Sequence, residues 1–392
     1  MPTLYRKITK RFVVIINLIA AMVYLAAGMA IYVHPVQYWY IALLGFAFPY
    51  IIIIILAFAV LWGCFKSKWL LLNVAVMLIT YNSISVVVAL HPFASSFTQE
   101  KKTNAIRILH WNTMCFAENM ANRVEGSEIR EKMLQYIKES DADVLCLQEF
   151  YDSDLPQYNN NIKYLTYNLG YPNYIYTKDY VRHTRVDTGG VVYAPIGYLG
   201  TAIFTKLPMI DSGRIAYSEA DNQNKESIAY LDLLKNNDTI RIYTAHLKSI
   251  NLAKTEYNEV YKIKDANATG LQASKNVFVK IKKAYTYRSK QAELLRLQIE
   301  TSPYPVILTG DFNDIPNSYT YNTIKGSNMQ DAYIKYGFGI GRTFSAISPT
   351  LRIDYAFADD AFSILQSKKE NKNLSDHYPI VLDVALKGNI AQ

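Results

Sequence analysis

The sequence predicts an α/β protein in which packed β layers are flanked by helices and preceded by membrane-spanning helices. Residues 1–100 contain only seven charged residues, and the stretch from Phe12 to Gly63 contains none. After residue 104, charged residues become frequent and short β-branched runs alternate with helical or polar stretches. The first pattern is typical of helices within a bilayer. The second is typical of sheets covered by helices.

Three apolar stretches of the N-terminal part are each close to the ~20 residues that a helix needs to cross the hydrocarbon core. They cover residues 12–32, 41–62 and 69–90. A buried helical hairpin of a soluble protein is the alternative, but two consecutive uncharged spans argue against it. We therefore expect three parts of the chain, namely a membrane anchor over residues 1–91, a linker over 92–104 and a folded domain over 105–388.

The third apolar stretch differs from the other two because it contains several polar residues. These are Asn73, Asn82, Ser83 and Ser85. Side chains of this kind can hydrogen-bond between helices that pack together in a membrane. We therefore keep this stretch as a third span.

Positive charge is unevenly distributed over the loops between these spans. Four basic residues precede the first span, namely Arg6, Lys7, Lys10 and Arg11. The first loop has no charge, whereas the second carries Lys66 and Lys68. The positive-inside rule then predicts a cytoplasmic N-terminus and an extracytoplasmic folded domain. The first span also resembles a signal peptide with a cleavage region at residues 27–30, and cleavage there would leave two spans and the same placement.

The overall charge and the cysteines exclude few functions. The formal net charge is +8, of which residues 1–100 hold +5. The remaining residues therefore carry only +3, and no dense basic stripe points to nucleic acid. Three cysteines form neither a disulfide framework nor a zinc motif.

The folded domain contains a series of short runs that are expected to be strands. They are Ile106–Trp111, Val144–Leu147, Thr201–Thr205, Ile228–Leu233, Thr239–His246, Val306–Thr309, Ile353–Ala358 and Ile380–Val384. An amphipathic helix is expected over Ser127–Glu139, with Ser127 as its N-cap. A second helix is expected around Tyr287–Glu300.

Polar residues able to bind a metal or handle a proton follow several of these runs. They are Asn112, Glu149, His246, Asp311, Asn313, Asp354, Asp376 and His377. Each of them alone has an ordinary explanation, such as an Asx turn or a solvated strand end. A set of six such strand ends in a fixed order is far less easily explained by chance, and loops at strand ends commonly carry reactive groups.

The motifs around these residues carry a family resemblance. The strongest are Leu-Gln-Glu at 147–149, Gly-Asp-Phe-Asn at 310–313 and Ser-Asp-His at 375–377, with Arg-Ile-Asp-Tyr at 352–355 and His246-Leu247 in support. The ordered set resembles the endonuclease/exonuclease/phosphatase superfamily over about residues 105–388. The resemblance implies a four-layer α/β sandwich with two mainly antiparallel sheets. It also implies metal-dependent hydrolysis of phosphate esters with Mg²⁺ or Mn²⁺, at a site where loops of both sheets meet.

The resemblance implies a role for each of these residues. The implied metal ligands are Asn112, Glu149 and Asp376. The implied catalytic residues are His246, Asp311, Asn313, Asp354 and His377. Among them, Asp311 would orient or deprotonate the attacking water, Asn313 and His246 would bind the phosphate, and Asp354 would hold His377. Either His377 or Asp311 is left as the general base, and no covalent intermediate is implied.

At two positions the sequence departs from the motifs of one branch of the family, which narrows the branches that it resembles. Residue 114 is Met where the abasic-site repair branch has an acid, and residue 246 is His where that branch has a Tyr-x-Pro-Asn pattern. The His pattern is instead similar to the nuclease, sphingomyelinase and inositol-phosphatase branches. The segments Tyr180–Leu199, which contains Arg182, and Ile250–Tyr287 are expected to shape the substrate pocket, with Arg182 as a substrate-binding residue. A solvated loop and a surface helix are the alternative for these two segments.

The substrate stays open between nucleic acid or nucleotide and a phospholipid headgroup. The lipid bilayer is the other expected partner, and no protein partner can be inferred. A catalytically inert membrane receptor or scaffold on the same fold is the competing function. The intact set of acids and histidines argues against it.

Overall fold

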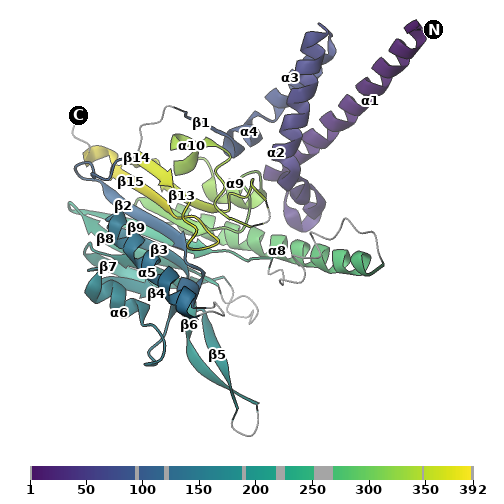
Figure 1. Ribbon diagram of the computed structural model, residues 1–392. Helices are drawn as coiled ribbons and strands as arrows, with labels where there is room; N and C mark the ends of the chain where they lie inside the picture. The colour runs from purple at the N-terminus through teal and green to yellow at the C-terminus, as the bar shows by residue number, and fades with distance from the viewer. Residues whose placement is uncertain are drawn as a thin grey trace. The chain divides into compact units, whose positions relative to one another are not determined.

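The computed structural model of the chain describes residues 2–92, 97–118, 123–187, 191–217, 226–250, 268–346 and 348–389. The chain forms two compact units, which we describe separately. The anchor unit comprises Met1–Val88, Ser249–Ala292 and Asp314–Ile324. The sheet unit comprises Ala89–Lys248, Glu293–Asn313 and Lys325–Gln392. Figure 1 labels most of the helices and strands of both.

The anchor unit is helical. Its elements are α1 (Pro2–Gly28), η1 (Met29–Ile31), α2 (Pro35–Cys64), α3 (Trp69–Ile79), α4 (Tyr81–Val87), the first part of α8 (Ala268–Glu300) and most of α9 (Tyr319–Lys325). Among the described residues, Tyr5–Ile31 and Pro35–Cys64 form helices long and apolar enough to cross a membrane. These two helices include most of the first expected span and all of the second.

The expected third span at 69–90 is not one continuous helix. Helices α3 and α4 are bent by 66° relative to each other. The break falls at Thr80, whose hydroxyl donates to the Val76 carbonyl at 2.9 Å and contacts the Tyr24 hydroxyl at 2.8 Å. A hydroxyl bonded back to the carbonyl four residues earlier bends a helix. The last two residues of the stretch, Ala89–Leu90, form strand β1 instead.

Polar side chains connect the helices of the anchor unit. The Asn17 amide donates to Asn73 at 2.9 Å, and the Trp62 indole donates to Asn17 at 2.7 Å. The Ser83 hydroxyl donates to the Gly28 carbonyl at 2.7 Å. The expectation that Asn73 and Ser83 hydrogen-bond between packed helices is confirmed.

Two segments from later in the sequence also pack within the anchor unit. The Tyr285 hydroxyl of α8 donates to the Ala42 carbonyl of α2 at 3.3 Å. The Asn317 amide donates to the Ala27 carbonyl of α1 at 2.9 Å. Gly45 of α2 permits this approach, because a Cβ there would lie 2.8 Å from the Asn317 carbonyl oxygen. The anchor unit therefore takes residues from beyond 1–91, and the division at residues 92–104 stays a proposal.

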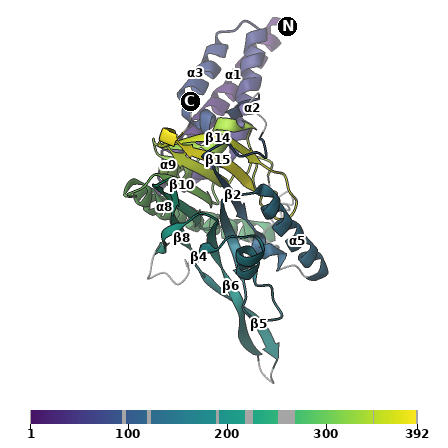
Figure 2. The same ribbon diagram turned by 90° about the vertical axis from the view of Figure 1, so that its left-hand side faces the viewer.

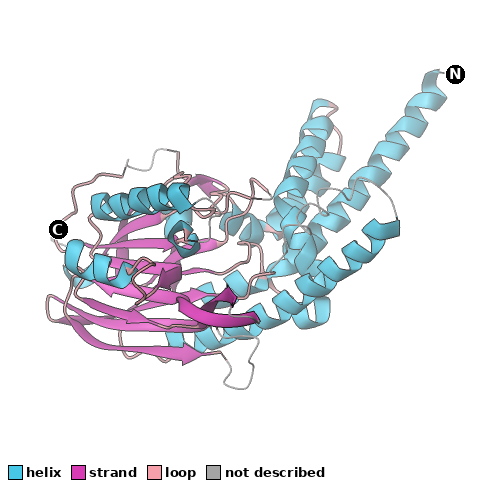
Figure 3. Ribbon diagram, turned by 60° about the horizontal axis from the view of Figure 1, so that its bottom comes forward, coloured by secondary structure: helices cyan, strands magenta, loops and turns pink. Residues whose placement is uncertain are grey.

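The sheet unit contains two large sheets (Figure 3). The seven-stranded sheet has the order β14-β15-β2-β3-β6-β4, with β5 added beside β6. The six-stranded sheet has the order β11-β13-β10-β9-β8-β7. Only β2–β3 and β9–β10 pair in parallel among the described strands of these sheets. A short pair, β1 with β12, lies apart from them.

The bounds of the strands follow the expected runs closely. The seven-stranded sheet contains β2 (Ile106–Asn112), β3 (Val144–Asp152), β4 (Asn173–Tyr176), β5 (Tyr180–Asp187), β6 (Val191–Thr205), β14 (Phe362–Lys369) and β15 (Ile380–Leu386). The six-stranded sheet contains β7 (Met209–Ala216), β8 (Ser227–Lys235), β9 (Asp238–His246), β10 (Val306–Asp311), β11 (Met329–Asp331) and β13 (Asp354–Asp359), and β12 is Phe338–Gly339. Every expected strand run lies in one of these strands, with Ile353 just before β13.

Two apolar layers hold the sheet unit together. The first lies between the sheets and includes Ile108, Ile242 and Ile307. The second lies between the seven-stranded sheet and helix α5 (Arg123–Ser140), which Figure 2 shows alongside β2. Since successive side chains of a strand point to opposite faces, a strand buried on both sides becomes a continuous apolar run. The expected fold, two mainly antiparallel sheets flanked by helices, is confirmed.

Both expected helices exist but begin earlier than expected. Helix α5 starts at Arg123, so Ser127 lies inside it and is not its N-cap. Helix α8 starts at Ala268 rather than near Tyr287. Residues 251–267 of the expected pocket-shaping segment lie outside the described residues. The remaining short helices are η2 (Met114–Ala117), α6 (Asn161–Lys163), η3 (Tyr164–Asn168), α10 (Ala332–Tyr336) and η4 (Lys387–Asn389).

Candidate active site

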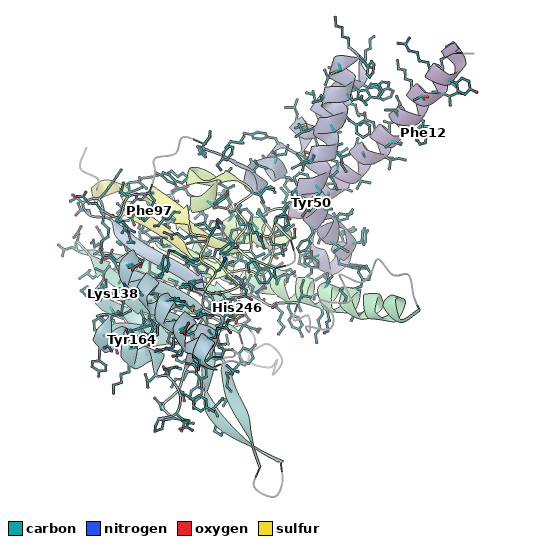
Figure 4. The ribbon with its side chains drawn as sticks, in the orientation of Figure 1. Phe12, Tyr50, Phe97, Lys138, Tyr164 and His246 are labelled. Carbon is teal, nitrogen blue, oxygen red and sulfur yellow. The ribbon has the colours of Figure 1, made fainter. Side chains whose placement is uncertain are left out.

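Three strand ends of the six-stranded sheet bring polar side chains into one row. Asp311 of β10 is paired with His246 on the parallel neighbour β9 and with Asp354 on the antiparallel neighbour β13. Neighbouring strands lie about 4.8 Å apart, so these three side chains are close. The Nε2 atom of His246 lies 3.7 Å from the Asp311 Oδ2 atom. Figure 4 labels His246 at the end of its strand.

The seven-stranded sheet contributes Asn112 and Glu149 from the parallel pair β2 and β3. Glu149 follows Gln148, the register partner of Asn112, and lies in a β-bulge with a φ of 47°. A bulge changes the direction of the side chain that it carries, and Glu149 is half-buried. The Asn112 amide donates to Glu149 at 3.3 Å and to Asp311 at 3.0 Å. Asn112 therefore joins the ends of the two sheets.

The loop before β15 adds Asp376 and His377. The Ser375 hydroxyl donates to the Asn112 carbonyl at 2.8 Å, and the Trp111 indole donates to the His377 carbonyl at 2.9 Å. These bonds hold the loop against β2. The His377 Nδ1 atom then lies 2.9 Å from Asp354 Oδ2, and its Nε2 atom lies 3.6 Å from Asp311 Oδ2.

The two acids beside His377 decide its charge. Burial by itself would lower the pKa of His377, but Asp354 and Asp311 outweigh burial and raise this pKa to about 10. Burial would also raise the pKa of Asp354, but His377 and His110 outweigh it and lower that pKa below its ordinary value. His377 is therefore an imidazolium at neutral pH, paired with an ionised Asp354.

The pKa values of the other two acids, Asp311 and Asp376, are raised, whereas that of Asp354 is lowered. Burial raises the pKa of Asp311, His377 opposes that shift and Asp354 adds to it. Burial also raises the pKa of Asp376, His377 opposes that shift and the nearby Glu149 adds to it. Groups with raised pKa values accept protons more readily than ordinary carboxylates do.

Asn313 lies beside the cluster, whereas Arg182 does not. Asn313 has a φ of 52°, and its backbone N–H donates to Asp311 Oδ1 at 2.9 Å. Its side-chain amide donates to the Leu247 carbonyl at 3.0 Å. Arg182 lies on β5, where its guanidinium stacks over the Tyr151 ring at 5.4 Å. No contact among the described residues joins Arg182 to the other expected site residues.

Sequence reasoning missed two residues that hold Asp354. The Nε2 atom of His110 lies 3.3 Å from Asp354 Oδ1, and its Nδ1 atom has no hydrogen-bond partner among the described residues. The Thr343 hydroxyl accepts the backbone N–H groups of Ile353 at 2.9 Å and Asp354 at 3.0 Å. A histidine in the expected strand Ile106–Trp111, two residues before Asn112, was the one available signal for His110. No sequence pattern marks Thr343.

Two sets of side chains in the cluster are candidates for holding a divalent cation. Asp311, Asp354 and His377 offer ligand atoms within 4.8 Å of one another. An imidazolium has no lone pair for a metal, so a cation bound to this set would have to displace the proton of His377. Glu149, Asp376 and the Asn112 amide form an oxygen set in which the two carboxylates repel each other. Hard oxygen ligands are those that Mg²⁺ and Mn²⁺ prefer, and we favour this second set.

The ion pair of His377 with Asp354 predicts a pH-dependent stability. The folded pKa of His377 is about 10 against an ordinary value of 6.5. Its stabilisation is therefore complete below pH 6.5 and is lost as the pH rises through 10. We expect His377→Gln to lower the unfolding temperature of the metal-free protein strongly at pH 6 and weakly at pH 10.

The measurement is thermal unfolding of the detergent-solubilised full chain in EDTA, at several pH values. His183→Gln, at an exposed position on β5, is the matched control and should show no such trend. An equal loss of stability at both pH values would contradict a charged His377.

The fold and the cluster together define an α/β protein of two packed sheets with a group of acids, amides and histidines where the sheets meet. The chain belongs to the Endonuclease/Exonuclease/phosphatase family, which matches residues 109–377. Members of this family act as phosphoesterases. Residues 10–87 match a second family, described as a domain of unknown function (DUF8431). No curated protein matches the sequence.

Several solved structures are similar to the chain at low identity. The human Nocturnin catalytic domain with bound sulfate is 19% identical, with 73% of this chain and 95% of that chain covered and a TM-score of 0.49. Humanized D. rerio TDP2 is 16% identical, with 72% and 99% covered and a TM-score of 0.47. The Bacteroides thetaiotaomicron mannosyl-6-phosphatase is 15% identical, with 72% and 100% covered and a TM-score of 0.45. Likenesses at this level carry no weight for substrate, and the family assignment rests on the match to residues 109–377.

Proposed function

We propose that this protein is a membrane-anchored, divalent-metal-dependent hydrolase of phosphate esters. The observation that carries the proposal is the meeting of Asn112 and Asp311, at strand ends of the two sheets, with Glu149 in the bulge of β3 and His377 in the loop before β15. Their contacts form one continuous set, from Glu149 through Asn112 to Asp311 and then His377. An ion pair that only stabilised the fold would need two of these groups. Hydrolysis of a phosphate ester needs all four, to hold a cation, accept a proton and stabilise the charge on the phosphate.

We propose Asp311 rather than His377 as the general base. Because His377 is an imidazolium at neutral pH, it has no lone pair with which to accept a proton. Burial raises the pKa of Asp311 although the hydrogen bond from Asn112 opposes this shift, and its carboxylate accepts the proton as a water oxygen attacks phosphorus. His377 and His246 then stabilise the charge on the phosphoryl oxygens, with Asp354 holding His377 in place.

The remaining side chains position the substrate and a cation. Glu149, Asp376 and Asn112 would hold the cation. A bound Mg²⁺ or Mn²⁺ would supply charge compensation at the phosphate and at the leaving oxygen. Asn313 would bind the phosphate by its amide, next to Asp311. Arg182 stays a weaker proposal, because its described contact is with Tyr151.

The substrate class is tested by direct assay. We expect the full chain in detergent to hydrolyse bis(4-nitrophenyl) phosphate slowly with Mg²⁺ and not at all with EDTA. Absence of hydrolysis with either Mg²⁺ or Mn²⁺ would contradict the proposal and favour an inert scaffold.

Two further assays separate the proposed substrates. Release of phosphorylated headgroups from mixed phospholipid vesicles would identify a lipid hydrolase. Nicking of supercoiled DNA that weakens steeply with salt would identify a nuclease, because phosphate-backbone contacts release counterions. We favour the lipid, since an anchored enzyme meets headgroups at high effective concentration. Rapid cleavage of DNA together with intact phospholipid vesicles would exclude the phospholipid as the substrate.

The placement of the enzyme outside the cytoplasm is a separate proposal, supported by the basic residues before the first span and at Lys66 and Lys68. We expect a reporter that is active only outside the cytoplasm to be active when fused after Gln392. The same reporter fused near Lys66 should be silent. Silence of both reporters would mean that the bent α3–α4 segment does not cross the membrane, and the opposite pattern would mean that the topology is inverted.

A further inference from the structure

The basic end of the anchor unit borders a partly open cavity that the proposed catalysis does not use, and the cations that line it are exposed. The cavity has a volume of about 660 Å³ and lies between the start of α1, the end of α2 and the loop after α2. Three of its lining residues are cations, namely Arg6, Lys7 and Lys10. Figure 4 shows nitrogen-tipped side chains extending from this end of α1, beyond the labelled Phe12.

The cations continue the packing face of α1. Arg6, Lys10, Val13 and Asn17 follow one another at spacings of four, three and four residues, so they lie on one side of the helix. Asn17 is fully buried and is bonded to Trp62 of α2. Lys10 is about 10 Å further along the helix axis, at 1.5 Å per residue. The face that packs against α2 at Asn17 therefore opens into the cavity at Lys10 and Arg6.

No acidic residue balances these charges nearby. The sequence has no Asp or Glu before Glu100. None of the residues that line the cavity is acidic, and no described salt bridge includes Arg6, Lys7 or Lys10. Like charges at positions i and i+4 of a helix repel each other, and the repulsion of Arg6 with Lys10 is relieved by an anion placed between them.

The other walls of the cavity are apolar. They are formed by Val13, Leu61, Trp62 and Phe65. The Trp62 ring is held in place by its bond to Asn17, whereas Phe65 is 68% exposed. The hydroxyls of Thr9 and Ser67 complete the lining and can donate to phosphate oxygens. A small free anion would make no favourable contact with the four apolar side chains. A lipid can place its phosphate among the cations and its glycerol and acyl carbons against the apolar side chains.

We infer that this cavity is a binding site for a phospholipid with a net negative headgroup. The site is distinct from the candidate active site, and the inference rests only on α1 and α2 lying in a bilayer. Basic pockets between membrane helices are suited to such headgroups, because each Lys or Arg near an anionic surface contributes about fivefold in affinity. The bound lipid stabilises the close approach of three cations at the end of α1.

The test compares lipid binding to the detergent-solubilised full chain by native mass spectrometry. The probes are dioleoyl-phosphatidylglycerol and dioleoyl-phosphatidylcholine, which share their acyl chains and differ in net charge. We expect the anionic lipid to bind roughly 100-fold more tightly, on the basis of three cations. The variant R6Q/K7Q/K10Q should lose this preference.

A control variant can remove the same number of arginines and lysines from outside the cavity. The variant R11Q/K66Q/K68Q also removes one Arg and two Lys from this part of the chain, and none of the three lines the cavity. It should keep the preference for the anionic lipid. Equal loss in both triple variants would mean that binding follows overall charge and would overturn the site.

A second arm uses the wild-type protein and does not depend on the folding of any variant. Glycerol 3-phosphate carries the phosphate without acyl chains, and we expect it not to displace the anionic lipid. Displacement at millimolar glycerol 3-phosphate would show that a soluble phosphate compound is the ligand and would overturn the inference. Hydrolysis of bis(4-nitrophenyl) phosphate is measured in parallel, so that loss of the lipid site and failure of the proposed activity are separate results.

Discussion

Replacing Glu149 with Gln is expected to lower the rate of phosphodiester hydrolysis by roughly 10³-fold or more, as is common for the loss of a metal ligand. Glu149 is half-buried at the end of the cluster, and its partner Asn112 can hydrogen-bond to an amide as well as to a carboxylate. The unfolding temperature should therefore stay close to that of the wild type. The loss should be accompanied by a weaker dependence on Mg²⁺ concentration or by a requirement for much higher Mg²⁺.

The matched control for this variant is Glu139→Gln, at an exposed position on α5. It removes the same charge outside the cluster and should leave both rate and metal dependence unchanged. Calorimetric titration of each variant with Mg²⁺ measures binding without turnover. Near-normal turnover of Glu149→Gln at the wild-type Mg²⁺ concentration would remove Glu149 from the metal site.

Asp311→Asn is expected to produce a loss of similar size, roughly 10³-fold, for a different reason. The asparagine keeps the shape of the side chain, but its one amide oxygen can accept only one of the two N–H groups that Asp311 accepts, from Asn112 and Asn313. It also cannot accept the proton of the attacking water. Mg²⁺ binding should be nearly unchanged, which distinguishes this variant from Glu149→Gln. Because burial raises the pKa of Asp311, the folded state disfavours its charge, and the substitution should not lower the stability.

The control is Asp360→Asn, at an exposed position after β13, which should behave as the wild type. A pH–rate profile adds a second measurement. If Asp311 is the base, the acid limb of the wild-type profile should be missing from the residual activity of Asp311→Asn. An acid limb that persists in this variant, and is lost instead in His377→Gln, would reverse the assignment of the base.

Part of the site could be predicted from the sequence because strand patterning places residues at strand ends. The apolar run at Val306–Thr309 can only be a buried strand or a helix, and the Gly-Asp that follows it marks its end. Glu149 is expected at the end of the run Val144–Leu147, but β3 continues to Asp152 and Glu149 lies in a bulge within it. The parallel pairing of β9 with β10, which places His246 beside Asp311, is a matter of register between distant segments. No local pattern specifies it.

The pKa values of the acids and histidines of the site are determined by the tertiary structure. Burial raises the pKa of Asp311 against the opposing effect of His377, whereas His377 and His110 outweigh burial at Asp354 and lower its pKa. In the sequence, His110 is one residue of an expected strand, and no motif assigns it a role. Its contact with Asp354 exists only because β13 lies close to it in the folded protein. Charge at a buried site depends on which groups lie within a few ångströms, and these groups come from four separate strands and loops.

The sequence by itself determined that this protein has two long apolar helices, a domain of two sheets flanked by helices, and a set of acids, amides and histidines at strand ends. Periodicity, charge and motif order are local properties, and they suffice for these features. Only the tertiary structure decided that the third apolar stretch bends at Thr80 and that α8 and Asn317 pack on the N-terminal helices. It also decided that His110 holds Asp354. Each of these depends on contacts between residues far apart in the chain, whose energies no local window contains.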